Sequence, residues 1–246
     1  MEQNRAFSDL LQTLGYDAYT VGARVHMGNE NGFGGFAHMA IIVTLDGIEY
    51  LTDVGFGGYG LTAPLPIFDG RHIIERPIDG VLPEQHRVTM GELPGARKKG
   101  HRTWLLQSRR NEESDWEVIY AFEKDFEFFP SDYEVYLVPR VHGSNSRMNW
   151  GTSTRPDSLF TNAIMCTIVG YNESLQAVSR TILSNGVLKK RENNQSHEIT
   201  KFKTEKERVT ALEKIYGIKL SQEEQDAIKT SKLAVENLDP DLKSIF

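Results

Sequence analysis

The stretch that decides the fold spans residues 35–57 and reads GFAHMAIIVTLDGIEYLTDVGFG. Two β-rich runs, residues 38–45 and 48–53, flank Asp46-Gly47, which is a strong signal for a two-residue hairpin turn. The stretch therefore predicts an antiparallel hairpin, in which His38 opens one strand and Asp53 closes the other.

His38 and Asp53 are expected to be near neighbours in this hairpin. His38 lies eight residues before Asp46, and Asp53 lies six residues after Gly47. Residues at similar distances from a hairpin turn face each other, directly or on a diagonal. A carboxylate placed there can fix the tautomer of the imidazole, so that its other nitrogen can take a proton from a nucleophile. A purely structural His–Asp pair would have the same spacing, and spacing alone leaves both interpretations open.

The regions around the hairpin predict an α+β protein. Apolar residues at helical spacing, ended by Gly15, predict a helix in the first 15 residues, and Ser221 with Glu224 predicts a capping box. We expect a glycine-rich loop over 28–35, a short helix over 126–138, and helices over 206–216 and 221–232. We expect strands over 19–25, 38–45, 48–53, 101–108, 116–122, 159–169, 177–183, 186–190 and 198–202. Hairpin-length connections between the strands predict antiparallel sheets.

Composition excludes several classes of protein. The 246 residues carry a formal net charge of −6 and two short basic runs, which argues against nucleic acid as a partner. No apolar run is long enough to span a membrane, and the first residues lack the apolar stretch of a signal peptide. A single cysteine, Cys166, cannot form an internal disulfide, so a reducing, cytoplasmic location is expected. The other six histidines lack metal-ligand spacing, so no metal is expected.

Residues 35–57 closely resemble the arylamine N-acetyltransferase family, and so do residues 22–25 and 2–15. Residues 129–132, 154–160 and 202–218 resemble later parts of the same family. The resemblance implies a cysteine-protease-like fold that lacks most of the N-terminal helical bundle. It places a remnant of that bundle at 1–15, an antiparallel β-barrel at 16–139, an interdomain connection at 140–160 and a C-terminal α/β lid at 161–246.

The resemblance also implies a chemistry. A Cys–His–Asp triad would move an acetyl group, or a malonyl group, from CoA to an arylamine, arylhydroxylamine or hydrazine by a ping-pong mechanism. His38 and Asp53 match the triad histidine and aspartate, and Phe56 matches an aromatic residue of the acceptor pocket. The positions that match coenzyme-contacting residues are Gly34, Ala37 and Asp157.

The third member of the triad is absent from these residues. In the family, the cysteine of an Arg-Gly-Gly-aromatic-Cys motif stands two residues before the position of Glu2, so it is expected before Met1. Glu2 and Asn4 match family residues close to that cysteine, although helix-end hydrogen bonding is an equally good interpretation. Cys166 lies in an apolar run typical of a core residue, and we do not expect it to be the nucleophile.

Two hypotheses follow for the chain. The first is an N-terminally truncated arylamine N-acetyltransferase that is inactive as written. The second is a complete but non-catalytic acyl-CoA-binding or interaction protein. The sequence carries no indication of oligomeric state.

Overall fold

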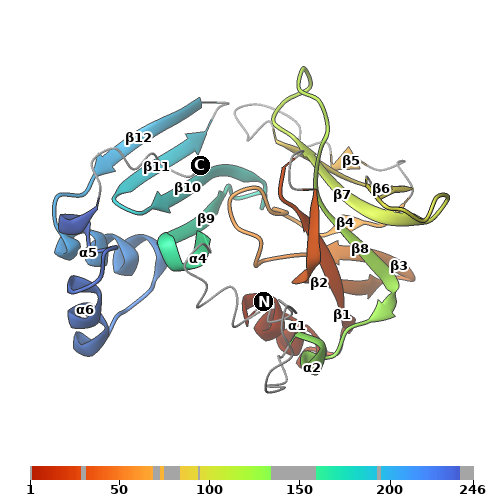
Figure 1. Cartoon of the computed structure of the whole chain (residues 1–246), viewed down its shortest axis with the longest axis horizontal. Helices are drawn as coiled ribbons and strands as arrows, with labels where there is room; N and C mark the ends of the chain where they lie inside the picture. The colour runs from red at the N-terminus through yellow and green to blue at the C-terminus, as the bar shows by residue number, and fades with distance from the viewer. Residues whose placement is uncertain are drawn as a thin grey trace. The chain divides into compact units, whose positions relative to one another are not determined.

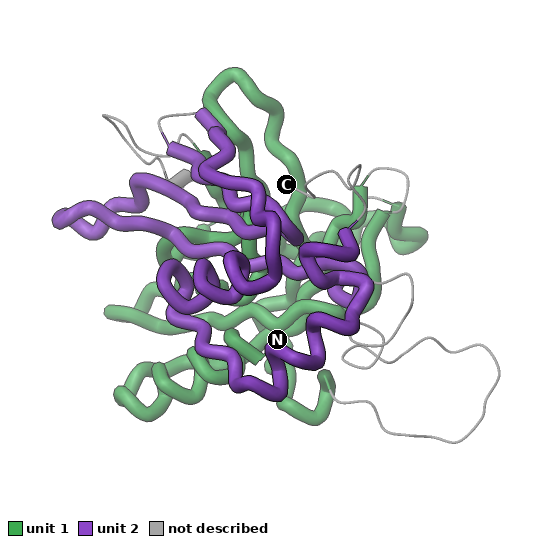
Figure 2. The backbone as a smooth tube through the Cα atoms, turned by 90° about the vertical axis from the view of Figure 1, so that its left-hand side faces the viewer, with its two compact units in different colours: residues 1–77, 83–151 green, residues 78–82, 152–246 purple. Residues whose placement is uncertain are grey.

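The computed structural model describes residues 2–28, 32–68, 73–74, 84–93, 95–133, 159–192 and 195–238. The chain divides into two compact units, one of residues 1–77 and 83–151 and the other of residues 78–82 and 152–246 (Figure 2). Most of the secondary structure is antiparallel strand, so the structure confirms the predicted α+β class.

Among its described residues, the first unit contains one curved sheet and the helices α1 (Glu2–Thr13) and α2 (Pro130–Tyr133). Its strands are β1 (Asp17–His26), β2 (Phe33–Leu45), β3 (Ile48–Thr52), β4 (Leu65–Pro66), β5 (Ile73–Ile74), β6 (Gln85–Glu92), β7 (Arg102–Arg109) and β8 (Glu117–Glu127). The strand order is β4-β3-β2-β1-β8-β7-β6-β5, and every neighbouring pair is antiparallel. β4 also contacts β6, so the sheet curls back into a nearly closed barrel, as predicted (Figure 1).

Strand β2 is buried on both faces, which explains its uninterrupted apolar sequence. Ala40 and Ile42 point into the barrel and belong to its main core. Ile41 and Val43 point the other way and pack with Phe7 of α1. The predicted helix at the start of the chain therefore forms because its apolar face covers the outer face of this strand.

The predicted hairpin turn is confirmed. Asp46 and Gly47 both have left-handed backbone angles, with φ of 51° and 78°, as a type I′ turn requires. Leu45 pairs with Ile48, and the pairing continues without a shift to Ile41 and Thr52. The turn therefore sets the register that brings His38 close to Asp53.

The second unit is a four-stranded antiparallel sheet of order β12-β11-β10-β9 with helices beside it. Its elements are α4 (Leu159–Asn162), β9 (Met165–Tyr171), β10 (Ala177–Ser184), β11 (Val187–Glu192), β12 (Gln195–Lys201), α5 (Glu205–Tyr216), α6 (Gln222–Lys229) and a 3₁₀ turn (Val235–Asn237). Ala211 and Leu212 of α5 pack against Leu183, Leu188 and Phe202 to form its core. The capping box predicted at Ser221 and Glu224 is present at the start of α6.

Two predicted element boundaries in the first unit are wrong. β2 begins at Phe33, so His38 lies inside the strand, and the glycine pair before it is part of the strand. Pairing with β1 holds this segment extended, with irregularities at Ala23/Arg24 and Arg24/His26.

The expected helix over 126–138 begins only at Pro130. The Phe128 amide donates to the Thr20 carbonyl, and this bond keeps the chain paired to β1 up to that point. Residues 134–138 of that prediction lie outside the described residues.

A third prediction, a strand from residue 159, is also wrong. Leu159–Asn162 is helical and the strand starts at Met165. Asn185 fixes this start, since its side chain accepts from the Ile164 amide at 3.0 Å and its own amide donates to the Ile164 carbonyl. A short apolar run does not by itself distinguish a strand from a helical turn. Within the described ranges, no helix is both long and apolar enough to cross a bilayer.

Candidate active site

His38 and Asp53 meet at the open end of the β2–β3 hairpin. Extending the register beyond Ile41 and Thr52 sets Asp53 opposite Ala40, two residues from His38 along β2. The two side chains therefore meet on a diagonal of the ladder, which is one of the two pairings that their spacing in the sequence predicts. Both residues are buried, with 7% of His38 and 4% of Asp53 exposed.

The contact between them is a short hydrogen bond from a ring nitrogen to a carboxylate. His38 Nε2 lies 2.6 Å from Asp53 Oδ2. An ionised carboxylate only accepts, so Nε2 carries the proton and, in the neutral ring, Nδ1 is left as the acceptor. Among the described residues, none forms a hydrogen bond with Nδ1. The arrangement therefore leaves one basic nitrogen free to take a proton.

Asn4 of α1 holds the other oxygen of the carboxylate. Its Nδ2 donates to Asp53 Oδ1 at 2.8 Å and also to the Met39 carbonyl, while its Oδ1 accepts from the Val54 amide at 2.8 Å. The Gly55 amide donates to the same Asp53 oxygen at 3.0 Å. Asn4 is fully buried and its side chain bonds outside its own helix, so of the two interpretations left open by the sequence the helix-end role is wrong. Asn4 joins α1 to β2 and to the residues that follow β3.

These contacts decide the charge of Asp53. Burial by itself raises the pKa of a carboxyl group, but the charge and hydrogen bond of His38, with the donors of Asn4 and Gly55, outweigh it. The net result is a pKa of Asp53 below its ordinary value. The carboxylate is therefore ionised at neutral pH and orients the imidazole.

Two aromatic rings surround His38. Phe56 packs edge-on against it with ring centroids 5.2 Å apart, and Tyr120 of β8 lies at 5.4 Å. Burial, and then the charge of Asp53, raise the pKa of Tyr120 well above its ordinary value, so the hydroxyl stays neutral. Within the described structure, this hydroxyl has no hydrogen bond that meets standard geometry. The imidazole therefore lies between the rings of Phe56 and Tyr120, where water screens the charge of Asp53 only weakly.

Sequence reasoning did not single out Tyr120. The available signal was strand alternation, because Tyr120 and Phe122 are inward residues of β8 and both belong to the barrel core. Alternation indicates burial but does not indicate which buried residue lies beside the His–Asp pair.

The remaining candidate residues are Gly34, Ala37, Asp157 and Cys166. Ala37 precedes His38 in β2 and is exposed, and the Gly34 carbonyl accepts from Arg24 Nη1 at 3.2 Å. Asp157 lies outside the described residues. Cys166 lies in β9 of the second unit, where burial raises the pKa of its thiol and the charge of Arg208 only partly offsets that effect. A thiol with a raised pKa is a poor nucleophile.

No group of three or more His, Cys, Asp or Glu side chains within the described residues is arranged to hold a metal ion. The chemistry that this geometry can perform is proton transfer at His38 Nδ1, with Asp53 fixing the ring and Phe56 lining the adjacent surface.

Residues 1–225 match the family model described as N-acetyltransferase. The chain belongs to the arylamine N-acetyltransferase family. The N-malonyltransferase FDB2 of Gibberella moniliformis is 28% identical to it over 250 residues, which cover 94% of this chain and 67% of that protein.

Solved structures of this family share the fold of the chain. The Mycobacterium marinum arylamine N-acetyltransferase in complex with CoA superposes with a TM-score of 0.63 at 21% identity, over 96% of this chain and 72% of that one. The Bacillus cereus arylamine N-acetyltransferase, described as having a unique Cys-His-Glu catalytic triad, gives a TM-score of 0.61 at 18% identity, over 89% and 72% of the two chains. The chain thus spans about two thirds to three quarters of these relatives.

Proposed function

We propose that the protein is the His–Asp part of an acyl-CoA-dependent N-acyltransferase that acts through a Cys–His–Asp triad. The observation that carries the proposal is the buried 2.6 Å contact between His38 and Asp53, which leaves Nδ1 as a free base. A charged carboxylate in a buried position keeps the ring in one tautomer and stabilises the imidazolium that forms during transfer.

The reaction has two halves. His38 Nδ1 takes the proton of a cysteine thiol, and the thiolate attacks the thioester carbonyl of the acyl-CoA. The bond from the acyl carbon to the CoA sulfur breaks, CoA leaves with the proton, and a thioester to the enzyme remains. The amine nitrogen of the acceptor then attacks that thioester, the bond to the cysteine breaks, and His38 takes the proton that the nitrogen loses.

The family relatives support acetyl or malonyl as the acyl group. One relative is named for N-malonyl transfer, and others are arylamine N-acetyltransferases, one of them in complex with CoA. A further relative is described by a catalytic triad of Cys, His and a carboxylate residue. An arylamine, arylhydroxylamine or hydrazine is the acceptor that this family membership favours.

We assign binding roles to residues around the pair. Phe56 would line the acceptor pocket, because its ring packs directly against His38. Gly34, Ala37 and Asp157 would contact CoA. Ala37 is adjacent to His38 and exposed, so a thioester could reach the ring along this edge of β2.

We further propose that the 246 residues by themselves do not transfer an acyl group. Their only cysteine is Cys166, whose raised pKa makes its thiol a poor nucleophile. Loss of a triad nucleophile lowers kcat by several orders of magnitude. The absence of a cysteine in the first unit also favours a second candidate function, a non-catalytic protein that binds acyl-CoA.

The experiment adds Arg-Gly-Gly-Tyr-Cys before Met1, so that a cysteine stands two residues before Glu2. The rate of alkylation of this thiol by iodoacetamide is measured against pH, with His38 and with His38→Gln. We expect the thiol to react at lower pH only when His38 is present, and we expect acetyl-CoA or malonyl-CoA to acylate it in the same variant. Equal alkylation profiles with and without His38 would refute the proposed base.

The unextended chain serves as the control and separates the two candidate functions. Intact-protein mass spectrometry after treatment with acetyl-CoA should show no added acyl group. A stable thiol-linked adduct on Cys166 would overturn both the proposed inactivity and the exclusion of that residue. Binding of CoA with no adduct in either chain would favour the non-catalytic function.

A further inference from the structure

Two arginines and a tryptophan lie on the outer face of the barrel sheet, away from His38. Arg87 of β6 pairs with Gln107 of β7, and their neighbours Val88 and Leu106 pair with each other and are fully buried in the barrel core. Side chains alternate along a strand, so Arg87 points to the opposite face. We call Arg87, Arg109 and Trp116 the arginine cluster.

The guanidinium groups of Arg87 and Arg109 both lie against the indole ring of Trp116. The Cζ atom of Arg87 lies 4.2 Å, and that of Arg109 4.8 Å, from the centroid of the Trp116 ring. Such stacking is favourable because the ring face is electron-rich. Both cations are thereby fixed beside one flat aromatic side chain.

Cross-strand glutamines fix the same two guanidinium groups from the side. Arg87 Nε donates to Gln107 Oε1 at 2.7 Å, and Arg109 Nε donates to Gln85 Oε1 at 2.5 Å. In each pair the glutamine is the residue directly opposite on the neighbouring strand. Because each arginine uses its Nε to make this bond, both terminal nitrogens of Arg87 and Nη2 of Arg109 remain available for a ligand, while Arg109 Nη1 donates to the Glu112 carbonyl.

In the part of the chain that the structure describes, the two positive charges of the cluster have no paired anion. Among the described residues, no carboxylate forms an ion pair with Arg87 or Arg109, and the one further contact is from Arg109 Nη1 to the Glu112 carbonyl at 3.2 Å. Glu112, Glu113 and Glu117 are nearby in the sequence but are exposed and do not pair with either cation. Burial, and then the charge of Arg109, lower the pKa of Arg87, as expected for two neighbouring positive charges.

We propose that the arginine cluster binds the phosphate group of a small molecule. A phosphate dianion matches two positive charges, and its oxygens can accept from the terminal nitrogens of both guanidinium groups. Binding relieves the repulsion between the cations, and the fixed side chains lose little conformational freedom. The phosphate can come from free phosphate compounds or from the phosphates of CoA. This site is separate from the His38–Asp53 pair, because the two lie on opposite faces of the sheet.

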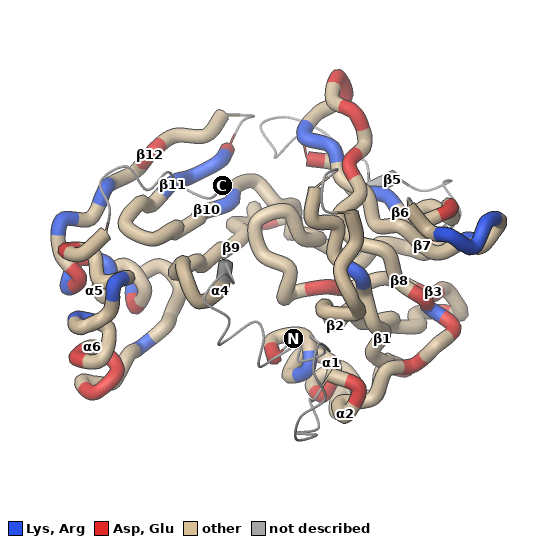
Figure 3. The backbone as a smooth tube through the Cα atoms, in the orientation of Figure 1, with Lys and Arg blue, Asp and Glu red and all other residues tan. Residues whose placement is uncertain are grey.

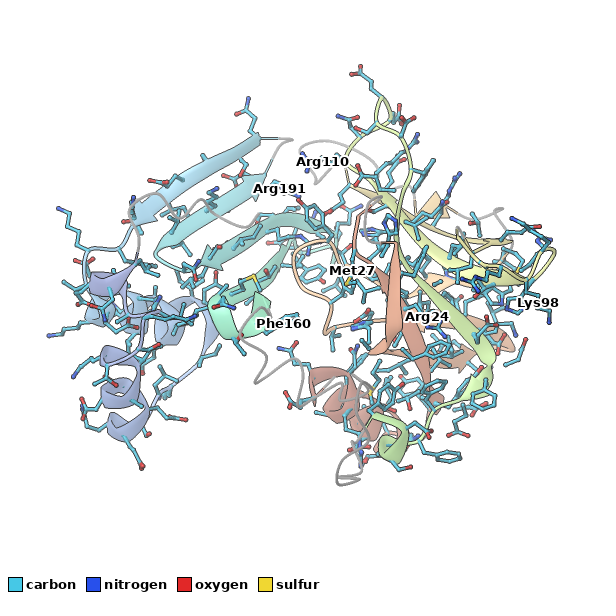
Figure 4. The ribbon with its side chains drawn as sticks, in the orientation of Figure 1. Arg24, Met27, Lys98, Arg110, Phe160 and Arg191 are labelled. Carbon is cyan, nitrogen blue, oxygen red and sulfur yellow. The ribbon has the colours of Figure 1, made fainter. Side chains whose placement is uncertain are left out.

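The test measures phosphate affinity by calorimetry and by Trp116 fluorescence at fixed ionic strength. The variant that removes the site is Arg87→Gln with Arg109→Gln. The matched control is Lys98→Gln with Lys99→Gln, which removes two positive charges at the turn between β6 and β7. Figure 3 shows Lys and Arg gathered at this turn, and Figure 4 labels Lys98 there.

We expect inorganic phosphate to bind the wild type and the lysine control equally, and to bind about tenfold more weakly for each arginine removed. If the double variant does not fold, the phosphate affinities of the single variants Arg87→Gln and Arg109→Gln test the proposal. Unchanged phosphate affinity in the arginine variants, or an equal loss in the lysine control, would overturn the proposal. Titration with CoA and with dephospho-CoA identifies the source. An arginine-dependent preference for CoA assigns the site to its 3′-phosphate, and equal affinities that both fall when the arginines are removed assign it to the diphosphate that the two compounds share. Affinities for both that do not depend on the arginines assign the site to other phosphate compounds.

Discussion

Replacement of Asn4 by alanine tests how the site is built. Asn4 makes three hydrogen bonds: two buried ones, to the ionised Asp53 and to the Met39 carbonyl, and a part-buried one from the Val54 amide. A bond to a charged group contributes about 2 kcal/mol and each of the others about 1 kcal/mol, so we expect Asn4→Ala to lower the free energy of unfolding by about 4 kcal/mol. No discount for solvent screening applies, since Asn4 is fully buried and Asp53 is 4% exposed.

The assay is urea unfolding of the chain at neutral pH, monitored by the fluorescence of the tryptophans, which lie in the first unit. Arg5→Ala is the matched control, because Arg5 lies on the same helix and pairs with Asp9 at 3.2 Å on the exposed surface. We expect that control to change the free energy of unfolding by less than about 0.5 kcal/mol.

A double-mutant cycle of Asn4→Ala with Asp53→Asn separates the bond to Asp53 from the other two. We expect a coupling of about 1 kcal/mol or more between the two positions. If Asn4→Ala costs no more than Arg5→Ala, or the coupling is zero, then Asn4 does not hold the carboxylate and the site has been misinterpreted.

Three further predictions concern the same unit. Gly22→Ala places a Cβ 2.5 Å from ring carbons of Phe128, so it should lower the free energy of unfolding by about 1–3 kcal/mol, as measured by urea unfolding; an unchanged midpoint would mean that the ring moves aside freely. The pKa of Asp53 is lower in the folded state, so its ionised form stabilises the fold above the ordinary pKa of 3.8, and this stability is lost as pH falls through the folded value. The difference in unfolding free energy between wild type and Asp53→Asn should therefore be largest above about pH 5 and shrink at lower pH, whereas a constant difference would contradict the lowered pKa. Tyr120→Phe removes a hydroxyl that has no well-formed hydrogen bond and should cost less than about 1 kcal/mol in a thermal or urea melt, while a loss of several kcal/mol would reveal a bond to Asp53.

The sequence predicts the hairpin well because the determinants are local. Asp46-Gly47 fixes the turn, and the turn fixes the register that brings His38 to Asp53. The capping box at Ser221 is predictable for the same reason. In each case the residues that decide the geometry are adjacent in the sequence.

The missed features depend on partners that are distant in the sequence. Asn4 lies 49 residues from Asp53, and a polar residue on an amphipathic helix gives no sign that it is buried against a strand. The glycine-rich segment before His38 was expected to be a loop, but β1 supplies a pairing partner that its own composition does not indicate. Propensity is overridden in both places by tertiary contacts.

Asp53 accepts a hydrogen bond from His38 Nε2 and leaves Nδ1 as the nitrogen that can take a proton. The most direct measurement is a long-range ¹H–¹⁵N correlation spectrum of the ¹⁵N-labelled chain at neutral and higher pH, with His38 assigned by comparison with His38→Gln. In the neutral form of the ring we expect a proton on Nε2, an unprotonated Nδ1, and loss of this preference in Asp53→Asn. A proton on Nδ1 in the neutral ring, or a spectrum unaffected by Asp53→Asn, would contradict it.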